Sequence, residues 1–269
     1  MSKVDLYYFS GTGNSLHIAR ELQKRIPENN LIPMVSLLDK PKIETDGKMV
    51  GLVFPIYFTT IPRPVKEFIK KLDLKSTPYI FAVATRIGTT HSAFSVIDKI
   101  LKKCGRRLDA AFSINMASND PKFNYKVPTE AEIAKLAENA YNKLDSIAPV
   151  IINQIQHREK DTSFITHIPL LQLIAFLVNL TDGLKAQFYT DSKCNGCGIC
   201  EKVCLSKKIT MKDNKPVWLE KVKCYHCSAC LNYCPVQSIQ LKSLTEKNGR
   251  YPHPYATASD IAGQKLIMR

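Results

Sequence analysis

Eight of the nine cysteines in this 269-residue chain fall into two copies of one spacing, C-x2-C-x2-C-x3-C. The first copy consists of Cys194, Cys197, Cys200 and Cys204, and the second of Cys224, Cys227, Cys230 and Cys234. This spacing lets one short loop place three thiolates around a cubane iron–sulfur cluster, while the fourth cysteine reaches a second cluster. The sequence therefore predicts two [4Fe-4S] clusters and a chain that carries electrons.

The crossover of the fourth cysteine predicts which ligands bind each cluster. One cluster is expected on Cys194, Cys197, Cys200 and Cys234, and the other on Cys224, Cys227, Cys230 and Cys204. The likeness of the two copies continues beyond the ligands, where Ile209 and Met211 correspond to Ile239 and Leu241. We therefore expect two equal halves, each with a short strand, a loop, a helical turn and a second strand, packed around the clusters with pseudo-twofold symmetry.

Two other uses of paired cysteines fit less well. Disulfide scaffolds are cysteine-dense throughout, whereas residues 1–193 contain only Cys104, which is expected to be a buried core thiol. The chain opens with a strand-like segment and no signal peptide, so a reducing, cytoplasmic location is expected. Structural zinc also uses C-x2-C pairs, but it leaves the third and fourth cysteine of each copy unexplained.

The first part of the chain alternates between apolar strand-like and helical segments. Strands are predicted at residues 4–9, 50–56, 79–84 and 110–115, and helices at 15–25, 64–72, 91–103 and 129–155, the last interrupted at Pro149. The strands lack polar alternation, as expected for a parallel sheet covered on both faces. The predicted fold class is an α/β doubly wound parallel sheet followed by a small α+β cluster domain. Ligands of such a sheet bind at the carboxyl ends of its strands.

These patterns divide the chain into four segments: an α/β domain at 1–160, an apolar helical connector at 161–183, a cluster domain at 184–245 and an irregular C-terminal tail at 246–269. The connector is too short to span a membrane and is interrupted by Gln172 and Asn179. It is expected to hold the two domains together. A dimer contact and a helix on a membrane surface remain alternatives.

The loop after the first strand carries phosphate-binding chemistry. It consists of Ser10, Gly11, Thr12, Gly13, Asn14 and Ser15. Its glycines let backbone N–H groups converge at a helix N-terminus, and its short side chains add further donors. The loop is not a Walker A motif, because no lysine follows, and Leu16 occupies the third glycine position of a dinucleotide fingerprint. A mononucleotide phosphate held by neutral donors suits this loop, with an ordinary glycine turn as the alternative.

This part of the chain resembles the flavodoxins, whose first loop has the form Ser/Thr-x-Thr-Gly-x-Thr. Residues 10–15 match that form except that Ser15 ends it. Flavodoxin-like FMN proteins place two more loops around the isoalloxazine. Their counterparts here supply Pro55, Tyr57, Phe58 and Thr59 from one loop and Thr85, Arg86 and Gly88 from the other. The resemblance implies FMN held by these residues, although a single aromatic residue is more often a packing residue than a flavin contact.

The order of the two parts resembles the EFR-type flavodoxin–ferredoxin fusions of anaerobic bacteria. Residues 54–62 and both cysteine copies carry that resemblance, which implies FMN in the first domain and a bacterial-type two-[4Fe-4S] ferredoxin domain after it. One departure is Leu205, which follows Cys204 where proline is usual, while Pro235 keeps it. This change is expected to loosen one turn without removing a ligand. Arg86 is a second departure, and we hypothesise that it stabilises reduced, anionic flavin; an arginine that faces solvent or a phosphate is the alternative.

The net charge of +14 favours an acidic redox partner, and no nucleic-acid recognition motif accompanies it. The favoured function is electron transfer between FMN and the two clusters, connecting a ferredoxin-like pool to a redox partner. A flavin-dependent reductase of a small acceptor is the first alternative, although no catalytic acid–base pair stands out. A redox-sensing or activating interaction protein is the second. The oligomeric state stays open.

Overall fold

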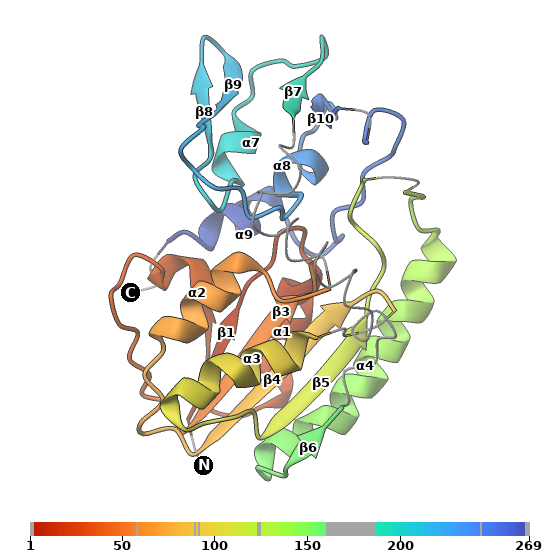
Figure 1. Ribbon diagram of the computed structural model, residues 1–269. Coiled ribbons are helices and arrows are strands. Elements are labelled where there is room, and N and C mark those ends of the chain that lie inside the picture. The colour runs from red at the N-terminus through yellow and green to blue at the C-terminus, as the bar shows by residue number, and fades with distance from the viewer. Residues whose placement is uncertain are drawn as a thin grey trace, which may run out of the picture.

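The structure is a computed structural model, which describes residues 3–57, 59–88, 90, 92–122, 125–159, 187–242 and 244–266. It consists of an α/β domain and a cysteine-rich module that lies beyond the carboxyl ends of the sheet strands (Figure 1). The predicted connector at 161–183 and the side chain of Phe58 lie outside the described residues. The carboxyl edge of the sheet therefore faces the cysteine-rich module directly.

The α/β domain is built on one six-stranded parallel sheet. Its strands are β1 (Val4–Tyr8), β2 (Asn29–Pro33), β3 (Met49–Pro55), β4 (Tyr79–Arg86), β5 (Ala110–Asn115) and β6 (His157–Arg158), in the order β2-β1-β3-β4-β5-β6. Neighbouring strands pair in parallel throughout. The order 2-1-3-4-5 is that of the flavodoxin-like doubly wound sheets, so the predicted fold class is confirmed. The edge strand β2 was not predicted, because its polar Asn29 and Asn30 hide the apolar pattern of a strand.

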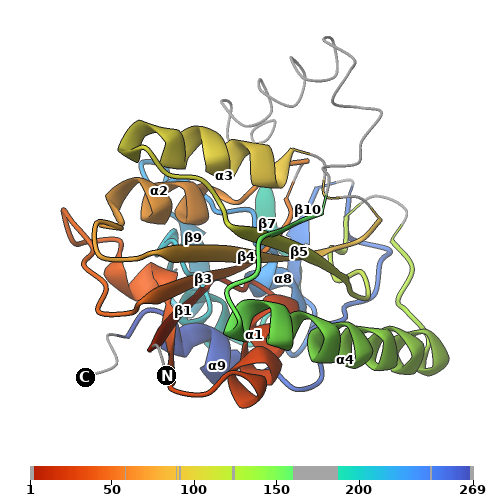
Figure 2. The same cartoon turned by 90° about the horizontal axis from the view of Figure 1, so that it is seen from below.

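Helices cover both faces of this sheet. One face carries α1 (Asn14–Arg25) and α4 (Glu130–Ile152), and the other carries α2 (Arg63–Lys71) and α3 (Ala93–Leu101); short 3-10 turns lie at η1 (Met34–Leu37) and η2 (Lys102–Cys104) (Figure 2). The helix α4 continues through Pro149, where an interruption was expected. Its last turn is held because Leu144, Ile147 and Ile151 are buried. None of the described helices is long and apolar enough to cross a membrane.

The prediction that Cys104 is a buried core thiol was wrong, because its side chain is exposed. The buried face of α3 ends at Leu101, and the chain then leaves the sheet through η2. Cys104 is the last residue of that turn, directly before Gly105 in the left-handed conformation. It therefore faces solvent.

The cysteine-rich module consists of two equal halves. The first contains β7 (Phe188–Thr190), α7 (Ile199–Lys202) and β8 (Ile209–Lys212), and the second contains β9 (Lys215–Trp218), α8 (Ala229–Asn232) and β10 (Ile239–Leu241). The strands of the two halves pair across the module, β7 with β10 and β8 with β9, both antiparallel. The repeat of a strand, a helical turn and a strand is thus present as predicted.

The turn after Cys204 has the same backbone conformation as its counterpart after Cys234, although it lacks the proline, and its expected loosening stays a prediction. Lys207 and Gln237 lie at equivalent positions after the two copies, and both adopt the left-handed conformation, with φ of 57° and 49°. Leu205 is only 2% exposed and belongs to the hydrophobic core that also contains residues of the α/β domain. The leucine therefore adds packing between the two parts, while Pro235 stays exposed.

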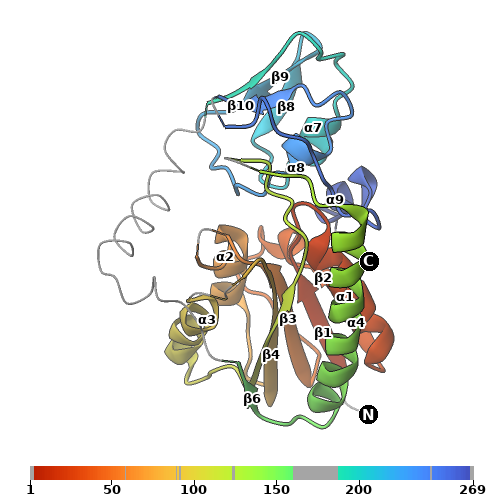
Figure 3. The ribbon, with the colours of Figure 1, turned by 90° about the vertical axis from the view of Figure 1, so that its right-hand side faces the viewer.

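The C-terminal segment, expected to be irregular, contains the helix α9 (Ala258–Gly263) between the two parts (Figure 3). A capping box starts this helix: the N–H of Asp260 donates to Thr257 Oγ1 at 3.1 Å, and the N–H of Thr257 donates to Asp260 Oδ2 at 2.8 Å. Ile261 is fully buried in the shared core. The prolines and glycine of this segment concealed a short helix that depends on packing between the two parts as well as on its capping box.

Candidate cofactor sites

The predicted phosphate loop joins β1 to α1 at the carboxyl edge of the sheet. Gly13 is left-handed, with φ of 105°, and its N–H donates to Ser10 Oγ at 3.1 Å. Asn14 Nδ2 donates to the carbonyl oxygen of Ala117 at 2.9 Å, and the hydroxyls of Ser15 and Thr85 are 2.7 Å apart. These bonds fix the loop to neighbouring strand ends. The loop is therefore shaped before any ligand binds, as a helix N-terminus that binds an anion requires.

A cavity of about 160 Å³ opens beside this loop. Among its lining residues are nine that the sequence singled out: Ser10, Gly11, Thr12, Asn14, Ser15, Pro55, Tyr57, Thr85 and Arg86. Gly13, Thr59 and Gly88 do not line it, although all three adopt positive φ in the turns that shape it. The structure thus brings all three predicted loops together at one place.

Other lining residues were missed by sequence reasoning. Asn119, Asp120 and Lys122 come from the segment after β5, and His226, Cys227 and Ser228 come from the second cysteine loop; Ile56 and Ile87 complete the lining. The first group follows a predicted strand at its carboxyl end, a signal that could have identified it. The second group was unpredictable, because one sequence does not reveal how two domains pack.

The polar lining of the cavity fits a phosphate-bearing ligand. Within the described residues, Asn14 Oδ1, Arg86 Nε and Asn119 Nδ2 are buried and lack a hydrogen-bond partner. Buried polar atoms are almost always paired, so these three are suited to bind a polar ligand. The volume is smaller than the roughly 300–1,000 Å³ of ordinary ligand pockets, so a complete FMN requires the surrounding loops to separate.

Tyr57 supplies an aromatic wall with a neutral hydroxyl. Burial is the main reason that its pKa lies well above the usual range, and the nearby Cys227 raises it further. A hydrogen bond with the backbone of Gly11 holds the phenol in place. Tyr57 therefore stays protonated and can donate a hydrogen bond at neutral pH.

The eight clustered cysteines line two further cavities. One is lined by Cys194, Cys197, Cys200 and Cys234, and the other by Cys204, Cys224, Cys227 and Cys230. Each set takes three cysteines from one copy of the motif and one from the other. These are the two sets that the crossover predicts. Among the described residues, no three His, Cys, Asp or Glu side chains converge as ligands of a single metal ion.

The thiols are poorly placed to ionise without a cation. Burial raises the pKa of Cys200 to about 11 and that of Cys227 to about 12, and neighbouring cysteines add to both shifts. Burial and the neighbouring cysteines also raise the pKa of Cys230 well above its usual value. Buried thiolates become stable when a metal supplies positive charge, so the chemistry of these cavities fits iron–sulfur clusters.

Backbone N–H groups bind the sulfurs symmetrically in the two halves. The N–H of Lys208 donates to Cys204 Sγ at 3.2 Å, and the N–H of Ser238 donates to Cys234 Sγ at 3.2 Å. Each donor lies four residues after its cysteine. Bonds of this kind stabilise thiolate ligands and adjust the reduction potential of a cluster.

Comparison with known proteins supports the cysteine-rich part of the chain. The family described as "4Fe-4S dicluster domain" matches residues 193–239. No curated protein matches the chain. This chain joins a flavodoxin-like fold to a 4Fe-4S dicluster domain.

Solved structures similar to the fusion include three flavin proteins, each matching about half of it. A flavoprotein of Lactobacillus acidophilus in complex with FMN is 13% identical and covers 42% of this chain and 93% of its own, with a TM-score of 0.35. Two-electron reduced flavodoxin of Megasphaera elsdenii is 16% identical, with coverages of 52% and 98% and a TM-score of 0.33. An FMN-dependent NADH-azoreductase of Bacillus anthracis, in complex with FMN, is 9% identical, with coverages of 57% and 100% and a TM-score of 0.39. Because these scores are low, the fold assignment rests on the strand order of the fusion itself.

The cavity at the phosphate loop shares a wall with one cysteine set in this fusion. Lys122, His226, Cys227 and Ser228 line both that cavity and the one bounded by Cys204, Cys224, Cys227 and Cys230. A Cβ placed on Gly11 would lie only 2.3 Å from the carbonyl oxygen of Cys227. We call this cysteine set the proximal set. The other, which we call the distal set, includes the exposed Cys197.

Polar contacts fix the proximal loop to the α/β domain. Lys122 Nζ donates to Ser228 Oγ at 3.1 Å, and Ser228 Oγ lies 3.1 Å from Asp120 Oδ1, which also pairs with Lys122. His226 and Ser228 adopt φ of 54° and 56° at the two positions where the first copy has glycine. Side chains at these positions carry conformational cost, which indicates that the junction depends on them.

Proposed function

We propose that this protein transfers electrons between FMN and two [4Fe-4S] clusters, with the proximal set holding the cluster next to FMN and the distal set holding the outer one. Cys227 is the observation that supports this proposal, because it lines both the cavity at the phosphate loop and the cavity of the proximal set. Electrons that pass between the two cofactors have only this shared wall of residues to cross. FMN exchanges electrons singly or in pairs, whereas each cluster takes one at a time.

The chain's own residues perform three tasks in this function. The phosphate loop anchors the nucleotide end of FMN, and the neutral Tyr57 borders the ring side. The bonds among Asp120, Lys122 and Ser228 hold the proximal loop at a fixed position beside it. Buried apolar residues around the proximal set, such as Leu231, exclude water from the junction.

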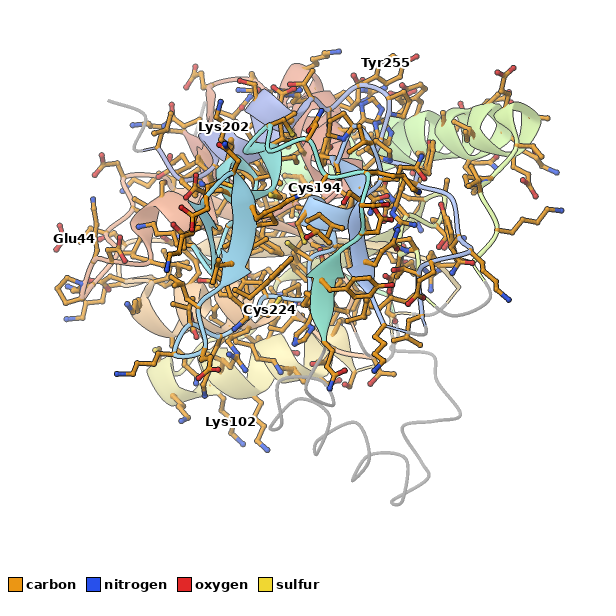
Figure 4. All side chains as sticks on the ribbon, turned by 90° about the horizontal axis from the view of Figure 1, so that it is seen from above. Glu44, Lys102, Cys194, Lys202, Cys224 and Tyr255 are labelled. Carbon is orange, nitrogen blue, oxygen red and sulfur yellow. The ribbon has the colours of Figure 1, made fainter. Side chains whose placement is uncertain are left out.

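The distal set faces the surface at which a partner protein docks. Cys197 is exposed, and Lys215 Nζ donates to the carbonyl oxygen of Cys194 at 3.0 Å. Figure 4 views the molecule from the module side, with Cys194 near the middle of the projection. Lys193 and Lys212 add positive charge around the same loop and hairpin. An acidic redox protein, such as a ferredoxin-like carrier of the reducing cytoplasm, matches this charge and this exposed cluster.

Anaerobic purification with iron, sulfide and flavin measured together tests the cofactor content. The proposal expects two four-iron clusters and one FMN per chain. Colourless protein, or protein with iron but without flavin after reconstitution, would contradict it.

Rapid reduction of Cys227→Ser, Cys197→Ser and Cys104→Ser tests the electron path. Cys227→Ser removes a proximal ligand and Cys197→Ser a distal one, whereas Cys104 is an exposed thiol outside both sets. Under limiting reduced ferredoxin, flavin bleaching should slow in both ligand variants and stay unchanged in Cys104→Ser. Electron paramagnetic resonance should show a different cluster altered in each. Equal flavin bleaching in all three variants would contradict the path.

A flavin-dependent reductase of a small acceptor is a second candidate function. Ile87 lines the cavity at the phosphate loop and is 63% exposed. The neighbouring Arg86 has a buried Nε that lacks a hydrogen-bond partner in the described part of the chain. This combination leaves room for a small ligand and supplies a positive charge. Steady-state assays with quinones, nitro compounds and oxyanions distinguish the two functions, since only a reductase has a saturable preference among them.

A further inference from the structure

The C-terminal residues 253–264, which we call the clasp, return from the cysteine-rich module to the phosphate loop. Neither the cluster motif nor the three cavity loops requires such a segment. The helix α9 forms its second half and lies between the two parts of the molecule (Figure 3). The clasp forms buried hydrogen bonds with backbone groups of the phosphate loop, so it can affect how the loop binds a ligand.

The side-chain amide of Gln264 binds both backbone groups of Ser10. The N–H of Ser10 donates to Gln264 Oε1 at 3.0 Å, and Gln264 Nε2 donates to the carbonyl oxygen of Ser10 at 2.7 Å. Gln264 is fully buried and Ser10 is 1% exposed. This pair of bonds fixes the peptide planes on both sides of Ser10, and therefore the direction in which the phosphate loop begins.

A second contact holds the middle of the same loop. The N–H of His253 donates to the carbonyl oxygen of Thr12 at 2.9 Å. The clasp lies so close to Gly13 that an added Cβ would come 2.6 Å from Ala256 Cβ and 2.7 Å from His253 Cβ. Glycine is thus required at position 13 both by its φ of 105° and by the approach of the clasp.

The clasp is also attached to the cysteine-rich module. Tyr233, next to the ligand Cys234, donates its hydroxyl to the carbonyl oxygen of Ala256 at 3.0 Å. Ile261 belongs to the same buried core as Leu205, which follows the ligand Cys204. Tyr233, the neighbour of one crossover cysteine, therefore binds the clasp directly, and Leu205, the neighbour of the other, belongs to the core in which the clasp is buried.

We propose that the clasp pre-organises the phosphate loop and so makes phosphate-dependent binding of FMN depend on the folded cluster module. Gln264 is the positioning residue in this arrangement, since it touches the loop and not the ligand cavity. The proposal rests on the proposed function in one respect, which is that FMN occupies the cavity at this loop. It predicts a loss of affinity that is confined to the phosphate end of the ligand.

Gln264→Met tests the proposal, because methionine retains the length of the side chain and removes both hydrogen bonds. The probes are FMN and riboflavin, which differ by the phosphate, titrated by flavin fluorescence against cluster-loaded, flavin-free protein under anaerobic conditions. Loss of two buried bonds is expected to weaken FMN binding about tenfold or more. Riboflavin binding should stay within about twofold, because riboflavin has no phosphate for the loop to bind.

Gln240→Met is the matched control. Gln240 is also a buried glutamine, but its amide binds Gln237, Thr245 and Arg250 within the cysteine-rich module and its immediate continuation. This variant should keep the preference of the wild type for FMN over riboflavin. Tyr233→Phe, which removes one link between the module and the clasp, should reduce that preference by a smaller factor than Gln264→Met.

The outcomes distinguish failure of the clasp proposal from failure of the proposed function on which it rests. If the wild-type, cluster-loaded chain binds neither flavin, the proposed function fails. If it binds FMN and Gln264→Met binds FMN equally well, or loses both flavins to the same extent, the clasp proposal is overturned while the function stands. A selective loss of FMN in Gln264→Met, without one in Gln240→Met, supports it.

Discussion

The carbonyl oxygen of Cys227 lies directly against Gly11, so that a methyl group on the glycine would come within 2.3 Å of it. One residue belongs to the phosphate loop near the start of the chain, and the other to the second cysteine motif near its end. Their contact makes the cofactor cavity and the proximal cysteine set parts of a single junction. The two parts can approach this closely only because the side chain of Gly11 is a hydrogen atom.

Gly11→Ala is therefore expected to push the module away from the phosphate loop. The clashing atom is part of the backbone and cannot rotate aside, and Cys227 Cβ is only 2.6 Å from the added group. Overpacking of this kind costs about 1–3 kcal/mol of stability. Anaerobic denaturation of the cluster-loaded protein measures this cost, and FMN titration should show weaker binding as well.

Gly263→Ala is the control for this prediction. An added Cβ at Gly263 meets nothing within 4 Å, and the residue lies in the helix α9. Alanine in a helix is favoured over glycine by roughly 0.5–1 kcal/mol, so this variant should be as stable as the wild type or more so. Equal effects of the two substitutions would show that the junction does not depend on the contact with Cys227.

Ser228→Gly places two effects of opposite sign in competition. Glycine removes the cost of the left-handed φ of 56°, which is about 1–2 kcal/mol. It also removes the hydroxyl that binds Lys122 and Asp120, and hydrogen bonds to charged groups contribute about 1.5–3 kcal/mol. The loss should exceed the gain, leaving the variant about 1 kcal/mol less stable in anaerobic denaturation.

Ser228→Ala shows whether both effects operate. Alanine loses the hydrogen bonds and keeps the left-handed backbone, so the expected order of stability is wild type, then Ser228→Gly, then Ser228→Ala. A glycine variant more stable than the wild type would mean that strain dominates at this position. The polar contacts with Asp120 would then contribute little to the junction.

Much of the fold was predictable because the strong signals in this sequence are local. The strands β1, β3, β4 and β5 are mostly apolar, and all four are buried along nearly their whole length. The strand β2 was not predicted, because an edge strand needs apolar residues on only one side and its polar residues obscured that apolar pattern. The same limit concealed α9, a helix of six residues that has almost no stability by itself.

The cysteine sets were predictable from spacing, whereas the junction was not. The crossover pairs Cys204 with the second copy and Cys234 with the first, and the cavities contain those combinations. The positions of His226 and Ser228 beside the phosphate loop depend on how two domains pack. A comparison of the two copies does offer one signal. It reveals that these residues replace glycines at left-handed positions, although only the structure says what they face.

Acid should loosen the clasp through His253. Burial, together with the stacked ring of His17 at a centroid distance of 4.3 Å, lowers the pKa of His253 from 6.5 to about 3. The unfolded chain therefore binds a proton at a higher pH than the folded chain does. The contribution of neutral His253 to the free energy of unfolding is complete above about pH 6.5. It is lost as the pH falls toward 3, and the free energy of unfolding decreases over this range by at most about 1.4 kcal/mol per pH unit.

His253→Asn provides the comparison, because asparagine keeps a side-chain acceptor near the N–H of Tyr255 and does not titrate. Loss of clusters in acid affects both proteins, so the informative quantity is the difference between their unfolding free energies. The advantage of the wild type should shrink from about pH 8 to about pH 5. Parallel stability curves would contradict a contribution from this histidine.

Lys215→Glu should slow electron exchange with an acidic carrier. Lys215 Nζ donates to the carbonyl oxygen of Cys194 in the distal set, so the substitution reverses the charge at the edge of that set. Steering by complementary charge raises association rates about 10- to 1,000-fold in total, of which one reversed charge should remove several-fold. Stopped-flow reduction by an acidic ferredoxin at a series of salt concentrations measures the rate and its salt dependence.

Lys102→Glu makes the same charge change at an exposed lysine after α3, remote from the distal set (Figure 4). Both variants have the same net charge, so any difference between them reports where the partner docks and not how much charge the protein carries. Lys215→Glu should lower the rate at low salt and flatten its dependence on ionic strength, because screening has less attraction left to remove. Equal rates in the two variants would place the docking surface elsewhere, and a wild-type rate without salt dependence would exclude an electrostatically guided partner.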